Sequence, residues 1–443
     1  QAMAISSTIS TSGSGSITLN GSAGSGDDWT YGILLRNSAV VQAENGTINI
    51  TGTGWGNSSN DRGVSLENNA RISSTSGAIN ITGYAGSAVG LSMVDNSSIY
   101  NASGHITIAT DQLGMDSATR ISSNGASQAQ LTIKPTTSSR NIGIGSYSIG
   151  LNIPSSYLTT NFVNGFNKIT IGSTSSASAP FGGIYIEGSI TFYDSLALVT
   201  AGAFYGGSTA NFNGNNNNLT LSPDTSDGGF RHNVNLGTGT LIKEGSGTLQ
   251  VYGGATHTYD GLTINNGAFQ HDDVLGGAIL FGSIPDVYVA AGATWEIQSK
   301  SYTIGTLSGA GNVTGINSLT LSSPNGEAFS GSMSSTLISS NLVKNGTGTF
   351  TLSGNNSSFI GEIIANAGTL IASHASALGA SAKGTIVASG ATLDVRANVG
   401  AEPVTLNGGT LSVPSGSISM SGALTLGANS TISVGGTQLA LSG

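Results

Sequence analysis

The first quarter of the sequence repeats with a fixed spacing, and this limits the chain to very few architectures. Four stretches open with a glycine followed by apolar residues on alternate positions, at Gly15, Gly46, Gly77 and Gly104. The first three openings are equally spaced, and the fourth follows after a slightly shorter interval. A second glycine divides each of the first three units, and the interval from it to the next opening is the same each time. Length therefore varies in one place only, as in a solenoid whose coils stay in register while one loop takes up insertions.

Apolar columns within the units predict the secondary structure. Positions two and four after each opening glycine hold Ile or Leu, as in Ile48 with Ile50 and Ile79 with Ile81. A spacing of two places side chains on one face of a strand. Further columns follow each dividing glycine, so each unit contributes three short strands. The fold class is therefore predicted to be all-β, a right-handed parallel β-helix (β-solenoid) forming a single elongated rod.

Polar residues recur five positions after each dividing glycine. They are Asn37, Asn68 and Asp95. Asn and Asp are common at turns because they tolerate left-handed backbone conformations. We therefore expect a turn at these positions whose side chains stack as a polar ladder.

The pattern divides the chain into three blocks. Residues 1–125 hold regular coils of about 27–31 residues, a period typical of solenoid repeats. Residues 126–236 form a less regular β-helix with loops, and residues 237–443 carry a different repeat. In this last block LIKEGSGTL, from Leu241, returns as LVKNGTGTF, from Leu342. No Pro-rich or charged linker separates the blocks, which favours one continuous rod over separate domains.

Composition excludes several classes of protein. The chain has 67 Gly, no Cys and only 8% charged residues, with a net charge of −9. Its 13 Lys and Arg form no basic patch, so no nucleic-acid partner is expected. No apolar stretch reaches the length that a membrane-spanning helix needs, so no membrane insertion is expected in this segment. No signal peptide is visible, and we expect the chain to be a fragment or processed form of a larger protein.

Two sets of motifs resemble known bacterial surface proteins. The pattern L-x-K-x-G-x-G-x-L/F, followed by N-x-G-x-L, resembles the autotransporter-associated β-strand repeat over Leu241–Gln270 and Leu342–Ile371. The stretches GTINITG, LTIKPTTSSRNIGIG (131–145) and GFNKITIG (165–172) resemble filamentous-haemagglutinin-like exoproteins. The resemblance implies the passenger of a secreted protein at the bacterial outer surface or in the extracellular space. It also implies secretion through a membrane β-barrel or attachment by a separate anchor.

The sequence evidence for a catalytic or metal-binding site is weak. The carboxylate pairs Asp27–Asp28 and Asp272–Asp273 lie in loop-like sequence and lack the partner motifs of pectin hydrolases of this fold. The five histidines have no metal-ligand spacing, and His271 is expected in a surface turn. We therefore predict a protein that is not an enzyme and that has no cofactor and no metal site.

Aromatic residues cluster in the variable loop of three successive coils. They are Trp29, Tyr31, Trp55 and Tyr84. Exposed rings offer apolar faces to sugars or protein partners, which makes these four the candidate ligand-binding residues. The alternative, which we favour from the sequence, is that the rings cover the coil below them.

Together these observations favour a non-enzymatic segment of a large bacterial surface adhesin or fibre, a rigid rod presenting weak repeated binding surfaces. A host or environmental glycan or protein surface is the expected ligand, and self-association through ends or flanks is expected because open coils leave unpaired backbone groups. Two alternatives stay open. One is a polysaccharide-active β-helix enzyme, and the other is a self-assembling filament or surface-layer subunit.

Overall fold

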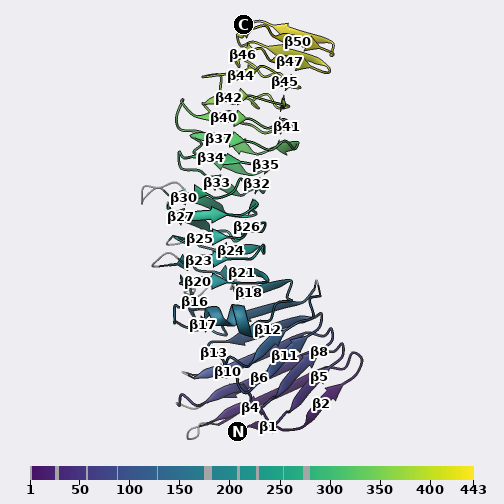
Figure 1. The fold of residues 1–443 in the computed structure, drawn as a ribbon, viewed down its shortest axis with the longest axis vertical. Coiled ribbons are helices and arrows are strands. Elements are labelled where there is room, and N and C mark those ends of the chain that lie inside the picture. The colour runs from purple at the N-terminus through teal and green to yellow at the C-terminus, as the bar shows by residue number, and fades with distance from the viewer. Residues whose placement is uncertain are drawn as a thin grey trace. The chain divides into compact units, whose positions relative to one another are not determined.

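The computed structural model describes residues 2–24, 29–55, 58–86, 88–126, 128–173, 182–206, 210–225, 229–252, 254–272 and 280–443. The chain divides into two compact units, Gln1–Gly239 (unit 1) and Thr240–Gly443 (unit 2). In each unit short strands stack one above the next (Figure 1). Among the described residues no helix is long and apolar enough to cross a membrane.

Unit 1 is built from coils that each add one strand to each of three parallel sheets. The first sheet holds β1 (Met3–Ile5), β4 (Tyr31–Leu35), β7 (Arg62–Leu66), β10 (Val89–Met93) and β13 (Leu113–Met115). The second holds β2 (Thr8–Thr11), β5 (Val40–Ala43), β8 (Arg71–Ser74), β11 (Ser98–Asn101) and β14 (Arg120–Ser122). The third holds β3 (Ile17–Ser22), β6 (Ile48–Gly54), β9 (Ile79–Ala85), β12 (His105–Thr110), β15 (Gln130–Lys134), β18 (Lys168–Ser173), β21 (Ser195–Thr200) and β24 (Leu219–Pro223).

The later coils of unit 1 form two further short sheets. One holds β16 (Ile142–Gly145), β19 (Ile184–Glu187) and β22 (Phe204–Tyr205), and the other holds β20 (Ser189–Thr191), β23 (Asn211–Asn213) and β25 (Asn233–Asn235). β17 (Leu151–Ile153) and a single π-helical turn, η1 (Tyr157–Asn161), lie among these coils.

Unit 2 repeats the same architecture. One sheet holds β26 (Thr240–Lys243), β29 (Gly261–Ile264), β32 (Asp286–Val289), β35 (Leu307–Gly309), β38 (Glu327–Phe329), β41 (Thr349–Leu352), β43 (Thr369–Ala372), β45 (Thr392–Val395), β47 (Thr410–Val413) and β50 (Thr431–Val434). A second holds β27 (Thr248–Tyr252), β30 (Ala268–Asp272), β33 (Thr294–Glu296), β36 (Asn312–Thr314) and β39 (Ser332–Met333). A third holds β34 (Ser301–Ile304), β37 (Ser318–Leu321), β40 (Asn341–Lys344), β42 (Glu362–Ala365), β44 (Thr385–Ala388), β46 (Val404–Asn407) and β49 (Leu424–Ala428). The pairs β28 (Thr256–Thr258) with β31 (Leu280–Phe281) and β48 (Ser417–Met420) with β51 (Gln438–Leu441) complete it.

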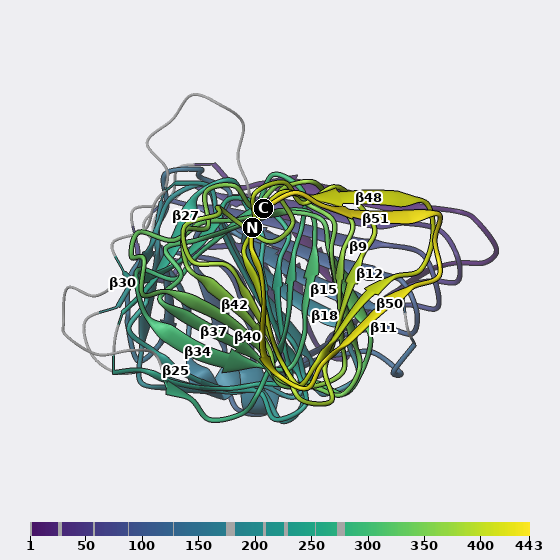
Figure 2. The ribbon, with the colours of Figure 1, turned by 90° about the horizontal axis from the view of Figure 1, so that it is seen from above.

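Register between coils follows the sequence repeat. Ile48 and Ile50 pair with Ile79 and Ile81, one repeat later, and the pairing is parallel. Seen from above, β34, β37, β40 and β42 of unit 2 overlap, as stacked coils do (Figure 2). The predicted parallel β-helix is therefore confirmed.

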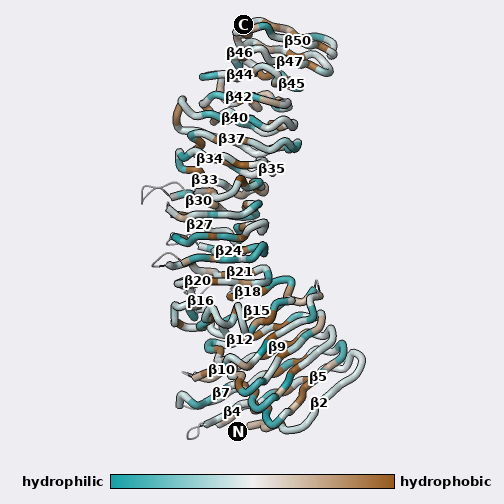
Figure 3. The backbone as a smooth tube through the Cα atoms, in the orientation of Figure 1, coloured by the Kyte–Doolittle hydropathy of each residue, from teal (hydrophilic) through white to brown (hydrophobic). Residues whose placement is uncertain are grey.

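The interior of unit 1 consists of the predicted apolar columns. Ile48, Ile79, Ile106 and Ile108 are fully buried. Hydrophobic segments recur from coil to coil along the tube in Figure 3. Since each strand turns alternate side chains inward, aliphatic columns that run from coil to coil fill the interior of the solenoid.

Two sheets come too close for a side chain at the dividing glycine Gly32 of β4 and at Gly52 of β6. A Cβ on Gly32 would lie 2.3 Å from the amide nitrogen of Thr53, and one on Gly52 would lie 2.1 Å from the carbonyl oxygen of Gly63. Real Cβ atoms do not approach backbone this closely. The glycines are therefore a packing requirement of the corner between the first and third sheets.

The recurring polar residues form the predicted turns. Asn37, Asn68 and Asp95 have φ values of 57°, 51° and 56°. Successive turns are joined by backbone bonds, because the Ser38 amide donates to the Asn68 carbonyl at 2.8 Å. A side-chain amide ladder occurs instead on the third sheet, where Asn80 Nδ2 donates to Asn49 Oδ1 at 3.0 Å.

Candidate ligand groove

The outer face of the third sheet of unit 1 is polar and almost uncharged. Outward-facing residues form rows across the strands, such as Asn49, Asn80 and Thr107 in paired positions. The only Lys, Arg, Asp or Glu side chains in its eight strands are Lys134 and Lys168. This face therefore presents hydroxyl and amide groups to solvent, with positive charge at two points.

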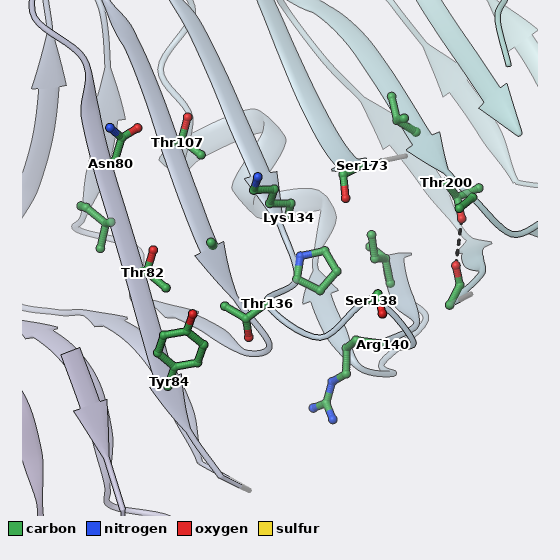
Figure 4. A pocket seen from close by; sticks show the side chains of 17 residues that line it. Asn80, Thr82, Tyr84, Thr107, Lys134, Thr136, Ser138, Arg140, Ser173 and Thr200 are labelled. Atoms are coloured by element: carbon green, nitrogen blue, oxygen red, sulfur yellow. Dashed lines mark hydrogen bonds between the residues drawn. The ribbon is translucent and has the colours of Figure 1, made fainter. Parts of the chain in front are cut away.

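A hollow of about 390 Å³ lies on this face and crosses five strands, β9, β12, β15, β18 and β21. In Figure 4 Tyr84 stands at one side, Lys134, Thr136 and Arg140 lie in the middle, and Thr200 stands at the opposite side. Five strands span four intervals of about 4.8 Å, so the hollow is about 19 Å long.

Two further hollows continue the first. One of about 550 Å³ shares Tyr84 and Thr136 with it and is also lined by Trp55. One of about 330 Å³ shares Arg140 with the first hollow and Asp111 with the second. We call the three together the sheet groove, which extends from the loop after β6 to β21.

Trp55 and Tyr84 offer open ring surface to the groove. Their side chains are 64% and 46% exposed. The Trp55 side chain is anchored, since its indole Nε1 donates to Ser22 Oγ at 3.3 Å in the preceding coil. This bond holds the indole edge against the preceding coil, while the ring face stays exposed. The Trp55 ring therefore contacts the neighbouring coil and still presents a surface to a ligand.

The other two predicted aromatic residues lie elsewhere. Trp29 is 58% exposed but does not line the groove. Tyr31 is only 7% exposed because it belongs to β4, whose five residues are all buried. For Tyr31 the favoured packing interpretation holds and the ligand-binding candidacy is wrong, since the residue directly precedes the dividing glycine Gly32 and is buried at the corner between sheets.

Asp111 is the one carboxylate among the described residues lining the groove, and it is already occupied. It accepts from the Thr136 and Thr137 amides at 2.9 Å and from Thr137 Oγ1 at 2.5 Å. Burial acts to raise the pKa of this carboxyl, but the hydrogen bonds from Thr137 and Thr136 outweigh it and lower the pKa. Asp111 is therefore an ionised anchor that holds the loop after β15 against the loop after β12.

Arg140 and Lys134 were not singled out from the sequence, yet both are charged side chains that line the groove. Within the described part of the chain no ion pair joins either to a carboxylate, and Arg140 Nε is buried without a hydrogen-bond partner. In the sequence they mark the two ends of KPTTSSR, the segment that begins with the last residue of β15 and lies within the motif quoted above for 131–145.

The remaining candidates from the sequence are the two carboxylate pairs and His271. Asp27, Asp28 and Asp273 lie outside the described residues, as does the side chain of Asp272. His271 is 2% exposed, so its assignment to a surface turn is wrong. Trp295 Nε1 donates to its Nε2 at 2.8 Å, and its Nδ1 faces the Tyr302 hydroxyl at 2.5 Å.

Burial is the main cause that lowers the pKa of His271 to about 3, and the nearby His257 adds to it. The imidazole is therefore a neutral core group, in which Nε2 accepts from Trp295 and Nδ1 carries the proton. Among the described residues no group of three His, Asp or Glu is placed to hold a metal ion.

Comparison of the chain with protein-family models, with curated proteins and with solved structures found no match in any of the three.

Proposed function

We propose that the chain is a non-enzymatic, extracellular β-helix segment of a bacterial surface adhesin, and that the sheet groove of unit 1 binds a glycan. The observation that carries the proposal is the pair of exposed rings, Trp55 and Tyr84, lining a long groove of a rigid parallel sheet. Aromatic faces stack on the apolar faces of sugars, and flanking hydroxyl and amide groups bond to sugar hydroxyls.

The groove is suited to a chain of sugars rather than to a single one. Its length of about 19 Å over β9–β21 exceeds a single ring, and strand register repeats the same polar groups at intervals of about 4.8 Å. Thr82 and Thr107 stand on neighbouring strands of this face, as does Asn80 beside Thr107. A repeating ligand laid across the strands would meet a repeating set of donors and acceptors.

The charges of the groove support binding over hydrolysis. A glycosidase of the usual kind needs two carboxyl groups on either side of the scissile bond. The groove offers Asp111 alone among its described lining residues, and both of its oxygens already accept hydrogen bonds. Those bonds also lower its pKa, so it is a poor proton donor at neutral pH.

Binding of the purified chain to an array of plant, bacterial and animal glycans tests the proposal. Trp55→Ala and Tyr84→Ala should each reduce binding about tenfold, since removing one stacking ring costs on the order of 1 kcal/mol or more. Tyr288→Ala is the matched control, because Tyr288 is a similarly exposed ring on β32 of unit 2. Binding that no groove variant alters, or sugar release by the chain, would contradict the proposal.

Self-assembly is a second candidate function, favoured by one observation in unit 2. Leu426, Ile432, Val434 and Leu441 on β49, β50 and β51 are all exposed. Within the described part of the chain each of these strands pairs with one neighbour, β46, β47 and β48 respectively. A strand that pairs on one side and carries exposed apolar side chains is a template for another strand, either of a following coil or of a second molecule.

A further inference from the structure

The third sheet of unit 1 has a charge opposite to that of the chain. The whole sequence carries −9, yet the eight strands of this face contain two lysines and no carboxylate. Lys134 lines the groove at the end of β15, and Lys168 begins the neighbouring strand β18, where it pairs with Gln130 at the start of β15. The strands of this face therefore carry a net positive charge within an acidic molecule, and this charge favours anions there.

Arg140 adds a second cation to the groove. Arg140 and Lys134 both line the 390 Å³ hollow, and Arg140 also lines the smaller hollow next to it. The Arg140 amide donates to the Thr137 carbonyl at 3.0 Å, and in the view of Figure 4 its guanidinium and the Lys134 ammonium point in opposite directions. Its buried Nε has no partner in the described part of the protein, although a buried donor that is left unpaired is costly.

We propose that the sheet groove takes a linear anionic oligosaccharide, whose acidic groups are bound by Arg140 and Lys134 while Tyr84 and Trp55 stack on its sugar rings. This rests on the glycan-binding function proposed above and adds the class of glycan. A guanidinium presents a planar fork of donors that matches a carboxylate, and the ammonium of Lys134 supplies a second charge.

The position of Asp111 gives the ligand a direction. Its carboxylate lines the 550 Å³ hollow with Trp55 and the 330 Å³ hollow with Arg140, whereas Lys134 lines only the 390 Å³ hollow. An acidic group is therefore favoured over Lys134, in the one hollow of the three that Asp111 does not line, and disfavoured beside Trp55, where Asp111 lies. The uncharged faces of the sugar chain therefore lie over Trp55, and its charges lie between β15 and β21.

A sugar chain fits the groove better than an acidic peptide. The groove is lined by Asn80, Thr82, Thr107 and Ser173, side chains that match the hydroxyl groups of a sugar at every step. Its strands run across the groove and not along it, so the sheet here offers no free strand edge to which a peptide backbone could add.

The test is the affinity of the whole chain for a galacturonic acid hexamer and for its methyl ester, the same hexamer without charge. We expect the acid to bind about tenfold more tightly or better, as expected for two charge-assisted contacts at a part-exposed site. Rising salt should weaken binding of the acid and leave the ester unchanged. A sulfated hexamer distinguishes the source of the charge, since tighter binding of the sulfated sugar would assign the pair to sulfate groups.

Variants locate the effect. Arg140→Gln with Lys134→Gln should abolish the difference between acid and ester, whereas Lys168→Gln, on the same face outside the groove, should keep it. Tyr84→Ala should weaken both ligands equally. Equal binding of acid and ester by the unmodified chain would overturn the anionic ligand and leave the glycan function intact.

Two other results would overturn the assignment of the groove to a glycan as well. Binding of neither hexamer, together with a blank glycan array, would overturn both proposals. Binding of an oligoglutamate peptide as tightly as the acidic sugar would overturn the assignment to a glycan, because it would show that charge alone is recognised.

Discussion

Replacing Lys344 with Met should lower the free energy of unfolding of unit 2 by about 2 kcal/mol. Lys344 lies at the end of β40 and is only 4% exposed, within the repeat that begins at Leu342. Its ammonium donates to the carbonyl oxygens of Gly346 at 2.5 Å and Ala367 at 2.7 Å. It therefore ties its own turn to the turn of the next coil.

The magnitude follows from two opposing effects. Hydrogen bonds to a charged group contribute about 1.5–3 kcal/mol each, so losing two removes about 4 kcal/mol. Burial lowers the pKa of Lys344, which shows that part of the lost hydration of the ammonium is not recovered. Removing the charge relieves that cost, and the methionine chain keeps the apolar packing, so about half of the loss is offset.

The assay is denaturant unfolding followed by tryptophan fluorescence. Trp295 is fully buried in unit 2, and the chain has three tryptophans, so Trp29→Phe with Trp55→Phe leaves a single reporter of this unit. Lys383→Met is the matched control, because Lys383 is exposed and its loss should change stability by less than about 0.5 kcal/mol. Lys243 occupies the equivalent place in the earlier repeat and donates to three carbonyls, so Lys243→Met should cost at least as much.

A result in which Lys344→Met is as stable as the Lys383 control would refute this reasoning. It would show that the free energy lost by burying the ammonium equals the free energy gained from its hydrogen bonds. The lysine would then make no net contribution to the stability of unit 2.

The remaining predictions concern pH, packing and association. Burial, partly offset by a bond from Thr385, raises the pKa of Glu402 to about 7, so its contribution to stability is present below pH 4.5 and is lost as pH rises through 7. Glu402→Gln should remove this dependence, worth about 3 kcal/mol, in urea titrations at several pH values. His271 acts in the opposite direction, because its lowered folded pKa means that stability falls as pH drops below about 6.5, and Glu402→Gln should make this acid limb steeper. Ile79→Asp should cost several kcal/mol because it buries an unpaired charge in a fully closed column, and thermal unfolding that is unchanged would show that the register is wrong. Light scattering of the chain at rising concentration should show growing species that Leu426→Lys suppresses, while a strictly monomeric chain would argue against strand addition at β49.

The repeat predicted the interior well because neighbouring coils repeat one another. Each coil copies the previous one, so the columns through Ile48 and Ile79 could be read from spacing alone. The turn at Asn68 followed from the same spacing. A β-helix is unusual in this respect, since residues one repeat apart in sequence are neighbours in space.

The groove could be predicted only in part. Tyr84 and Trp55 were identified as aromatic residues of the variable loop, but the loop alone does not show which rings stay exposed, and Tyr31 was drawn into the wall. Arg140 and Lys134 come from a less regular coil, where the sequence has no preceding copy to set its register. Both line a hollow that Tyr84 also lines, and this depends on the path of the loop after β15, which spacing does not encode.

The burial of polar side chains was also not predicted from the sequence. His271 lies in sequence with two aspartates, which favours a surface turn, yet the structure places its ring between Trp295 and Tyr302. A sequence pattern shows whether a side chain of a strand faces the interior only when the register of the strand is known. The hydrogen-bond partners of a buried imidazole come from other coils, which the local sequence does not show.

Hydrogen exchange of the chain with and without the galacturonic acid hexamer tests the central claim most directly. The account predicts slower exchange in peptides covering 80–86, 107–112 and 134–141, which line the sheet groove, and no change on the outer faces of unit 2. Protection confined to unit 2 or to the first and second sheets of unit 1, under conditions where the hexamer is bound, would contradict it.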